Sequence, residues 1–322
     1  MNSIDLRLTN PLIRIVRART FLAMLCCVVL SLTSLQADAA DPPAAETFAS
    51  AFVTTQDGAR IHYLHGGKAG AAPAVVFIPG WTWSAPIWQD QMTPLAPSRR
   101  VVAMDPRSQG DSSMTADGNT PEGRAQDLAA LLQQLGDAPV VLVGWSQGVQ
   151  DVAAYIDKFG TARLAGIVLV DSALSAGPAS FEVDPAGTRQ LLERMAIYAE
   201  YPKEYLAGML DASRTKPFTA AEKERQVALK RQTPTSTGLS MLVTDLLTTD
   251  RRGVVAKIDK PTLVIAAATS SELAAQKKMA EDIPEAKLHV IENAGHAVFL
   301  DQPEEFAKAL AEFLDGLWPG RS

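Results

Sequence analysis

One serine in a glycine-flanked turn carries the strongest chemical signal in this sequence. The segment G-W-S-Q-G at 144–148 directly follows the apolar run 140–143 and precedes a helix-like stretch. Between a buried strand and a helix, a G-x-S-x-G turn holds its serine in a strained and accessible conformation. Glycines two residues before and after the serine remove a steric clash that side chains would cause. Ser146 is therefore the candidate nucleophile.

A serine hydroxyl needs a neighbouring base before it can attack a carbonyl. The chain offers four histidines, and three of them lie within strand patterns: His62, His65 and His289. His296 instead follows the last apolar strand on a loop, where parallel strands present ligand-binding residues. Elimination and position therefore select His296 as the candidate base.

The oxyanion formed by such an attack needs hydrogen-bond donors. The backbone N–H of Gln147, at the start of the helix after the serine, is one candidate. The turn at 79–81, which ends the apolar run 74–78, is expected to supply the second donor through the N–H of Trp81.

Alternating strand and helix patterns predict the scaffold that positions these residues. Buried strands are expected at 74–78, 101–104, 140–143, 167–170, 263–265 and 288–291, and two shorter ones within 51–63. The clearest helix begins with Thr120 as N-cap and Pro121 at its first position, and it ends at Gly136. This alternation indicates an α/β fold with a mostly parallel sheet covered on both faces.

The alternation of strand and helix patterns stops between about residues 176 and 252, where no apolar run typical of a buried strand occurs. Helical patterns at 188–198 and 220–231 replace it, separated by prolines. An all-helical insertion between two parallel strands most simply forms a cap over their carboxyl ends.

The first 39 residues have the pattern of a secretory signal peptide. Four arginines precede the apolar stretch 21–35, and an A-x-A site ends at Ala39. The apolar stretch is too short for a stable membrane anchor, so we expect an exported protein, periplasmic or secreted. Cys26 and Cys27 would leave with this peptide, so the mature chain would form no disulfide. Residues 40–50 are expected to be a flexible lead-in.

Composition narrows the range of functions. The 322-residue chain is 47% hydrophobic and 20% charged, which is typical of a globular protein and not of a disordered one. Its net charge of −6 lacks the basic surface of a nucleic-acid-binding protein. We find no metal-binding or phosphate-binding motif and no dinucleotide fingerprint, so no cofactor is expected.

Several further motifs resemble the α/β-hydrolase fold superfamily, in particular its serine esterases and lipases. The segment D-P-R-S-Q-G-D-S at 105–112 is similar to the superfamily's D-x-R-G-x-G-x-S stretch, with Ser108 in place of a glycine. P-G-W at 79–81 resembles its H-G-x turn, and 295–306 resembles its catalytic histidine and final helix. The resemblance implies an eight-stranded single domain over 51–320, with its core in 51–175 and 253–320 and the helical cap in 176–252.

The resemblance leaves the orienting acid of the serine–histidine pair open. Relatives carry it after the strand that here ends at 265, but this chain has no carboxylate there until Glu272. Some members carry the acid after the preceding sheet strand, at the position of Asp171. Asp171 is therefore the first candidate for the acid and Glu272 the alternative, while an acid from elsewhere in the chain, or none, remains open. Loss of the acid can lower the rate by about 10⁴ without abolishing turnover.

The sequence thus predicts an exported serine hydrolase that cleaves a small, largely apolar carboxylic ester or related acyl compound. Two alternatives remain. One is a ligand-binding pseudo-hydrolase with a degraded acid loop. The other is a cofactor-free perhydrolase or lyase of the same fold.

Overall fold

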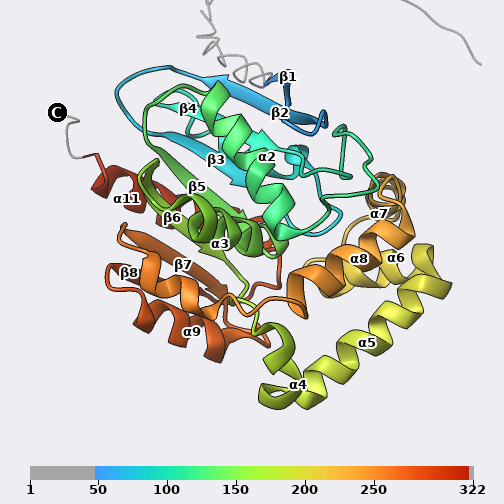
Figure 1. The fold of residues 1–322 in the computed structure, drawn as a ribbon. Helices are drawn as coiled ribbons and strands as arrows, with labels where there is room; N and C mark the ends of the chain where they lie inside the picture. The colour runs from blue at the N-terminus through green and yellow to red at the C-terminus, as the bar shows by residue number, and fades with distance from the viewer. Residues whose placement is uncertain (1–47, 319–322) are drawn as a thin grey trace, which may run out of the picture. The chain divides into compact units, whose positions relative to one another are not determined.

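A computed structural model describes residues 48–318 of the chain, which form an eight-stranded sheet flanked by helices (Figure 1). The strands are β1 (Ala49–Thr54), β2 (Arg60–Gly67), β3 (Ala74–Ile78), β4 (Arg100–Met104), β5 (Val140–Trp145), β6 (Leu164–Val170), β7 (Thr262–Ala267) and β8 (Ala286–Ile291). Their order is β1-β2-β4-β3-β5-β6-β7-β8. The pairs β1–β2 and β2–β4 are antiparallel, and the remaining pairs are parallel. This confirms the predicted α/β sheet.

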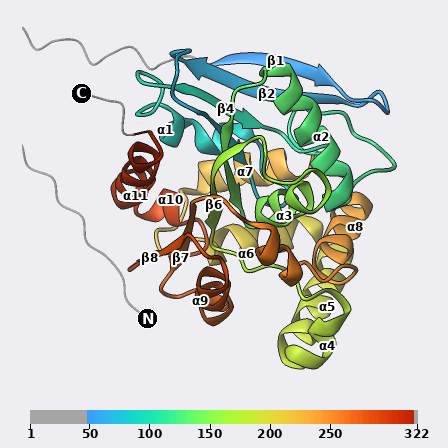
Figure 2. The same ribbon diagram turned by 60° about the vertical axis from the view of Figure 1, so that its left-hand side comes forward.

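Helices cover both faces of the sheet (Figure 2). They are the long helices α2 (Pro121–Gln134), α3 (Gln147–Phe159), α9 (Leu273–Asp282) and α11 (Pro303–Gly316), and the short helices η1 (Ala85–Trp88), α1 (Gln89–Met92), η3 (Arg252–Lys257) and α10 (Val298–Asp301). Along β3, Val75 and Phe77 pack into one core with Trp88 and α11, while the alternate residues face α2 and α3. Side chains alternate across a strand, so every residue of a central strand is buried on one face or the other.

The first long helix begins where the sequence predicts. The Thr120 side-chain oxygen accepts from the N–H of Gly123 at 3.1 Å, and Pro121 occupies the first turn. The helix ends at Gln134, and Gly136 adopts a positive φ of 98° in the connection to β5. A glycine tolerates this conformation without steric cost, so the chain turns sharply there.

The expected helical insertion lies between β6 and β7. It contains η2 (Gly177–Ala179), α4 (Ser180–Val183), α5 (Pro185–Glu200), α6 (Pro202–Ala212), α7 (Ala220–Lys230) and α8 (Thr235–Leu246). Trp81, which follows β3, donates from its ring N–H to the carbonyl of Gly238 in α8 at 2.9 Å. Its ring also meets that of Tyr198 in α5 edge-on, at 5.0 Å between centroids. These contacts attach the insertion to the carboxyl end of the central strand β3.

The predicted signal peptide lies outside the described residues, as does most of the predicted lead-in. The strand β1 begins at Ala49, so residues 49 and 50 of that lead-in belong to the sheet. Between residues 48 and 318, no helix combines the length and the apolar character that crossing a bilayer requires.

Candidate active site

Ser146 occupies a strained turn between β5 and α3. Its φ of 57° and ψ of −116° lie outside the ordinary regions for a non-glycine residue. A side chain at Gly144 would collide with the carbonyl of Gly148, and one at Gly148 would collide with the carbonyl of Ile78. The two glycines therefore allow the close approach of strand and helix that the turn requires.

His296 and Asp171 form a hydrogen-bonded pair at the carboxyl end of the sheet. Nδ1 of His296 lies 2.7 Å from Oδ2 of Asp171, and the two residues are 125 positions apart in the chain. The carboxylate is 1% exposed, whereas the imidazole is 40% exposed. A buried carboxylate on Nδ1 fixes the tautomer and leaves Nε2 as the nitrogen available for proton transfer.

The backbone holds Asp171 in place at the end of β6. Its φ is 44°, its N–H donates to the carbonyl of Ile265 at 2.7 Å, and its Oδ1 accepts from the N–H of Ala267 at 2.8 Å. Both of these partners belong to β7. Pairing of β6 with β7 therefore aims the carboxylate at the loop that carries His296.

Glu272, the other candidate acid, has different partners. Its Oε2 accepts from the N–H of Ala173 at 2.8 Å and from the Ser172 hydroxyl at 3.3 Å. The carboxylate thus stabilises the loop after Asp171, and Asp171 is the acid that meets His296.

Residues without a role in the sequence analysis hold the histidine loop. Trp145 donates from its ring N–H to the His296 carbonyl at 2.9 Å. Asp301 accepts from the N–H groups of Gly295 at 2.9 Å and Thr215 at 2.7 Å. Burial opposes ionisation of Asp301, but these backbone hydrogen bonds outweigh it and lower the pKa of the carboxyl. Asp301 lies within the segment that resembles the superfamily, which was the one available signal for it.

Of the candidate residues, all except Asp171 line one cavity of about 160 Å³. It is lined by Trp81, Ser146, Gln147, Gln150, Ser172, Leu242, Asp245, Leu246, Glu272 and His296. The Ser146 hydroxyl makes no hydrogen bond to another residue between 48 and 318. The hydrogen bond between a nucleophilic serine and its base is often long in a ligand-free site and tightens when substrate binds.

Two backbone N–H groups beside Ser146 are free to act as donors. Those of Trp81 and Gln147 bond to no acceptor within the described residues, and the first N–H groups of a helix have no intrahelical partner. A Cβ added at Gly80 would lie 3.1 Å from Cβ of Ser146, so the turn before Trp81 passes directly beside the serine. This arrangement suits an oxyanion that forms at Ser146.

The remaining histidines lie elsewhere: the side chain of His65 has a ring contact with Tyr63 and no hydrogen bond between residues 48 and 318, whereas His62 and His289 form hydrogen bonds. His62 bonds to Asp105 and Ser50, and His289 bonds to Glu305 at 3.1 Å. His62, Asp105 and Asp111 place their ligand atoms within 4.8 Å of one another. Because both ring nitrogens of His62 are already hydrogen-bonded, a metal ion there would have to displace these partners.

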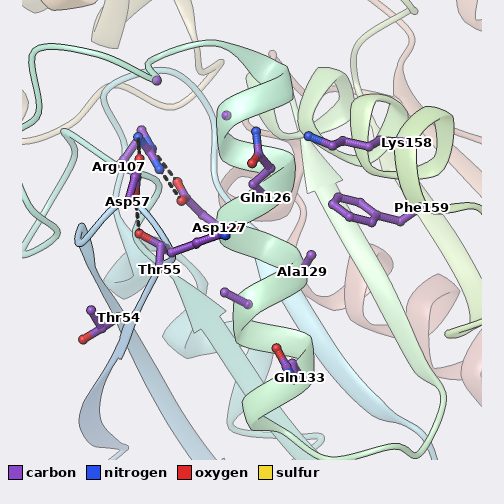
Figure 3. A pocket seen from close by; sticks show the side chains of 14 residues that line it. Thr54, Thr55, Asp57, Arg107, Gln126, Asp127, Ala129, Gln133, Lys158 and Phe159 are labelled. Carbon is purple, nitrogen blue, oxygen red and sulfur yellow. Dashed lines mark hydrogen bonds and ion pairs between the residues drawn. The ribbon is translucent and has the colours of Figure 1, made fainter.

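A larger surface cavity, of about 870 Å³, lies beside α2, and an arginine that lines it is paired with two aspartates. Figure 3 shows Arg107 between Asp57 and Asp127 at this place. Nε of Arg107 donates to Oδ2 of Asp127 at 2.7 Å, and its Nη1 donates to Oδ2 of Asp57 at 2.9 Å. The neighbouring Ser108 has a φ of 60°, which explains why a glycine suits this position in similar sequences.

Comparison with known proteins identifies the family of this chain. Residues 75–309 match the family model described as the alpha/beta hydrolase family. The chain is 30% identical to the non-heme chloroperoxidase CPO-A1 of Kitasatospora aureofaciens over 81% of its length and 98% of the relative. It is 37% identical to the bifunctional esterase/perhydrolase DCH of Acinetobacter calcoaceticus over 38% of its length and 44% of the relative. A bromoperoxidase structure from Bacillus anthracis superposes with a TM-score of 0.74 at 25% identity, covering 83% of this chain and 100% of that one.

Proposed function

Because the chain belongs to the alpha/beta hydrolase family, we propose that it is a serine hydrolase that cleaves small carboxylic esters through an acyl-enzyme. The observation that carries the proposal is the hydrogen bond between the buried carboxylate of Asp171 and the imidazole of His296. The imidazole lines the same cavity as the strained Ser146. These are the three roles that acyl transfer by a serine requires.

The proposed reaction begins when Oγ of Ser146 attacks the ester carbonyl and Nε2 of His296 takes its proton. The N–H groups of Trp81 and Gln147 stabilise the oxyanion. The imidazolium, held by Asp171, then protonates the departing alcohol, which leaves an acyl group on Ser146. Water activated by His296 hydrolyses this acyl-enzyme and restores the serine.

Perhydrolysis is a second candidate, favoured by the names of the relatives. An acyl-enzyme attacked by hydrogen peroxide in place of water releases a peracid, through the same residues and without a cofactor. DCH is described as both an esterase and a perhydrolase, and CPO-A1 as a non-heme chloroperoxidase. The two outcomes differ only in which nucleophile reaches the acyl-enzyme.

A pseudo-hydrolase has less support. The feature that suggested it was the missing carboxylate after β7, and Asp171 provides a carboxylate to His296 from the end of β6. We also propose that the protein is exported, because the sequence pattern of residues 1–39 is typical of a signal peptide.

A fluorophosphonate probe combined with short-chain nitrophenyl esters tests the proposed function. We expect the probe to label the protein at Ser146, as located by peptide mass spectrometry, and the esters to be hydrolysed. Adding hydrogen peroxide with an acyl donor and measuring peracid separates perhydrolysis from hydrolysis. If the folded protein is neither labelled nor active on any ester, the ligand-binding alternative replaces this proposal.

A further inference from the structure

A buried carboxylate from the insertion faces the cavity that contains Ser146. Asp245 lies on α8, lines this cavity and has a side chain only 4% exposed. Its Oδ1 accepts from Nη2 of Arg124 at 2.6 Å. Its Oδ2 accepts from no donor within residues 48–318. This carboxylate oxygen has no donor of its own, so a ligand that donates to it gains a charge-assisted hydrogen bond, which is stronger than one between neutral groups.

Arg124 holds this carboxylate in a fixed position. The guanidinium is 1% exposed, and its Nε donates to Oδ1 of Asp151 in α3 at 2.8 Å. Gln147 also faces it, and the amide oxygen of Gln147 accepts from Nε at 3.0 Å in the orientation that satisfies both groups. Arg124 therefore links α8 of the insertion to the helix that follows Ser146.

Negative charge exceeds positive charge around this arginine. Arg124 faces the two carboxylates, Asp151 and Asp245, while the nearby Arg251 pairs with Glu122 at 2.5 Å. Burial raises the pKa of Asp151 to about 7 and also raises that of Asp245, although Arg124 opposes both shifts. Arg124 thus favours the charged form of Asp245, whose carboxylate is an acceptor on the cavity wall.

The other polar groups of the cavity are largely occupied by the protein. Gln150 donates to the carbonyl of Ala173 at 2.8 Å and accepts from the N–H of Ser175 at 3.1 Å. Glu272 binds the same loop. No lysine or arginine is among the residues that line this cavity. The cavity thus favours a substrate group that donates a hydrogen bond and disfavours an anionic one.

Resting on the proposed function, we propose that Asp245 determines specificity by accepting a hydrogen bond from a hydroxyl or amino group of a short ester. The preferred substrates are hydroxylated or aminated esters, and not the largely apolar ones that the sequence predicts. The donor can belong to the acyl part or to the alcohol part, and the test below separates the two.

The test compares matched esters at pH 8, above the pKa of Asp151. Nitrophenyl 3-hydroxybutyrate against nitrophenyl butyrate examines the acyl part, and glyceryl monobutyrate against propyl butyrate examines the alcohol part. We expect kcat/KM to be about 10-fold higher or more for the donor-bearing ester in at least one pair, as a hydrogen bond to a charged acceptor provides. In Asp245→Leu this ratio should fall to about 1, because the acceptor that distinguishes the two esters is gone.

Asp151→Asn is the matched control, because Asp151 pairs with the same Arg124 but does not line the cavity. It should leave the substrate ratio unchanged. An equal loss of the ratio in Asp151→Asn would show that the arginine network, and not contact with Asp245, sets the preference. A wild-type ratio of 1 or below in both pairs would also overturn the proposal.

Binding to the Ser146→Ala protein gives a result that does not depend on turnover. Calorimetry with 3-hydroxybutyramide against butyramide, and with glycerol against propanol, should show the same donor preference. If that preference is absent in both pairs, the proposal for Asp245 fails even when esters are hydrolysed. If it is present but no ester is hydrolysed, the proposed function alone fails.

Discussion

Two regions of this molecule bring together a serine, a histidine and an aspartate. At the edge of the sheet, Oγ of Ser50 lies 2.8 Å from Nε2 of His62, whose Nδ1 lies 2.8 Å from Oδ2 of Asp105. At the carboxyl end of the parallel strands, His296 meets Asp171 at 2.7 Å, but the hydroxyl of Ser146 forms no hydrogen bond with the rest of residues 48–318. The edge arrangement is therefore the more completely connected of the two.

Their surroundings differ in every other respect. Ser50 lies in the regular strand β1, paired with Leu64 across an antiparallel ladder, and Asp105 also accepts from the N–H groups of Ala85 and Asp111. Ser146 has a strained backbone, a cavity and two free N–H donors beside it. A hydrogen-bonded serine–histidine–aspartate chain is therefore not sufficient for acyl transfer. The space for a substrate and the oxyanion donors distinguish the two regions.

Replacing each serine with alanine should give the largest difference in catalytic activity between the two regions. We expect Ser146→Ala to lower kcat/KM for a nitrophenyl ester by about 10⁴-fold or more. Ser50→Ala should stay within about twofold of the wild type, because no substrate site surrounds it. A loss above tenfold in a folded Ser50→Ala protein would show that the edge arrangement takes part in the reaction.

Removing the charge of each aspartate should give the next largest difference. Asp171→Asn is expected to lower kcat by about 10³–10⁴-fold, since the tautomer of His296 is no longer fixed. Asp105→Asn should lower the free energy of unfolding by about 1–3 kcal/mol and leave kcat nearly unchanged, because its hydrogen bonds join β2, η1 and the turn at Asp111, away from the cavity. Steady-state kinetics and urea denaturation of both variants distinguish these outcomes.

Glu272→Gln is the control for Asp171→Asn, since Glu272 lines the cavity but bonds to Ser172 and Ala173. Its kcat should remain within about threefold of the wild type. Equal rates for Asp171→Asn and the wild type would remove Asp171 from the proposed mechanism.

The smallest expected effect is the contribution of His62 to the pH dependence of the free energy of unfolding. Burial opposes protonation of His62, but the hydrogen bond to Asp105, with the charges of Asp105 and Asp111, raises its pKa above 6.5. A raised pKa in the folded state contributes stability below the unfolded value, and this contribution is lost as pH rises through the folded value. The advantage of the wild type over His62→Gln in free energy of unfolding should thus shrink as pH rises from below 6.5 through the folded-state pKa of His62.

Urea unfolding of both proteins at several pH values between 5 and 9 measures this change. Ester hydrolysis per folded molecule should be the same in both. A pH-independent stability difference would contradict the assigned role of His62.

Local sequence features predicted much of the scaffold. Apolar runs bounded by turns located the strands, because a central strand buries both of its faces. Thr120 and Pro121 located the start of α2. The threonine side chain accepts a hydrogen bond from a free backbone N–H of the first turn, and proline already has a helical φ. The search for a histidine outside the strand patterns led to His296, which lines the cavity with Ser146.

The sequence by itself determined the strained turn at Ser146, because the spacing of Gly144 and Gly148 expresses a steric demand that acts within a few residues. Only the tertiary structure decided between Asp171 and Glu272 as the partner of His296, because Asp171 is 125 positions away from that histidine. The pairing of β6 with β7 sets the direction of that carboxylate. Asp245 likewise carries no local signal. Its contact with Arg124 spans 121 positions and exists only because the insertion folds back over the end of the sheet.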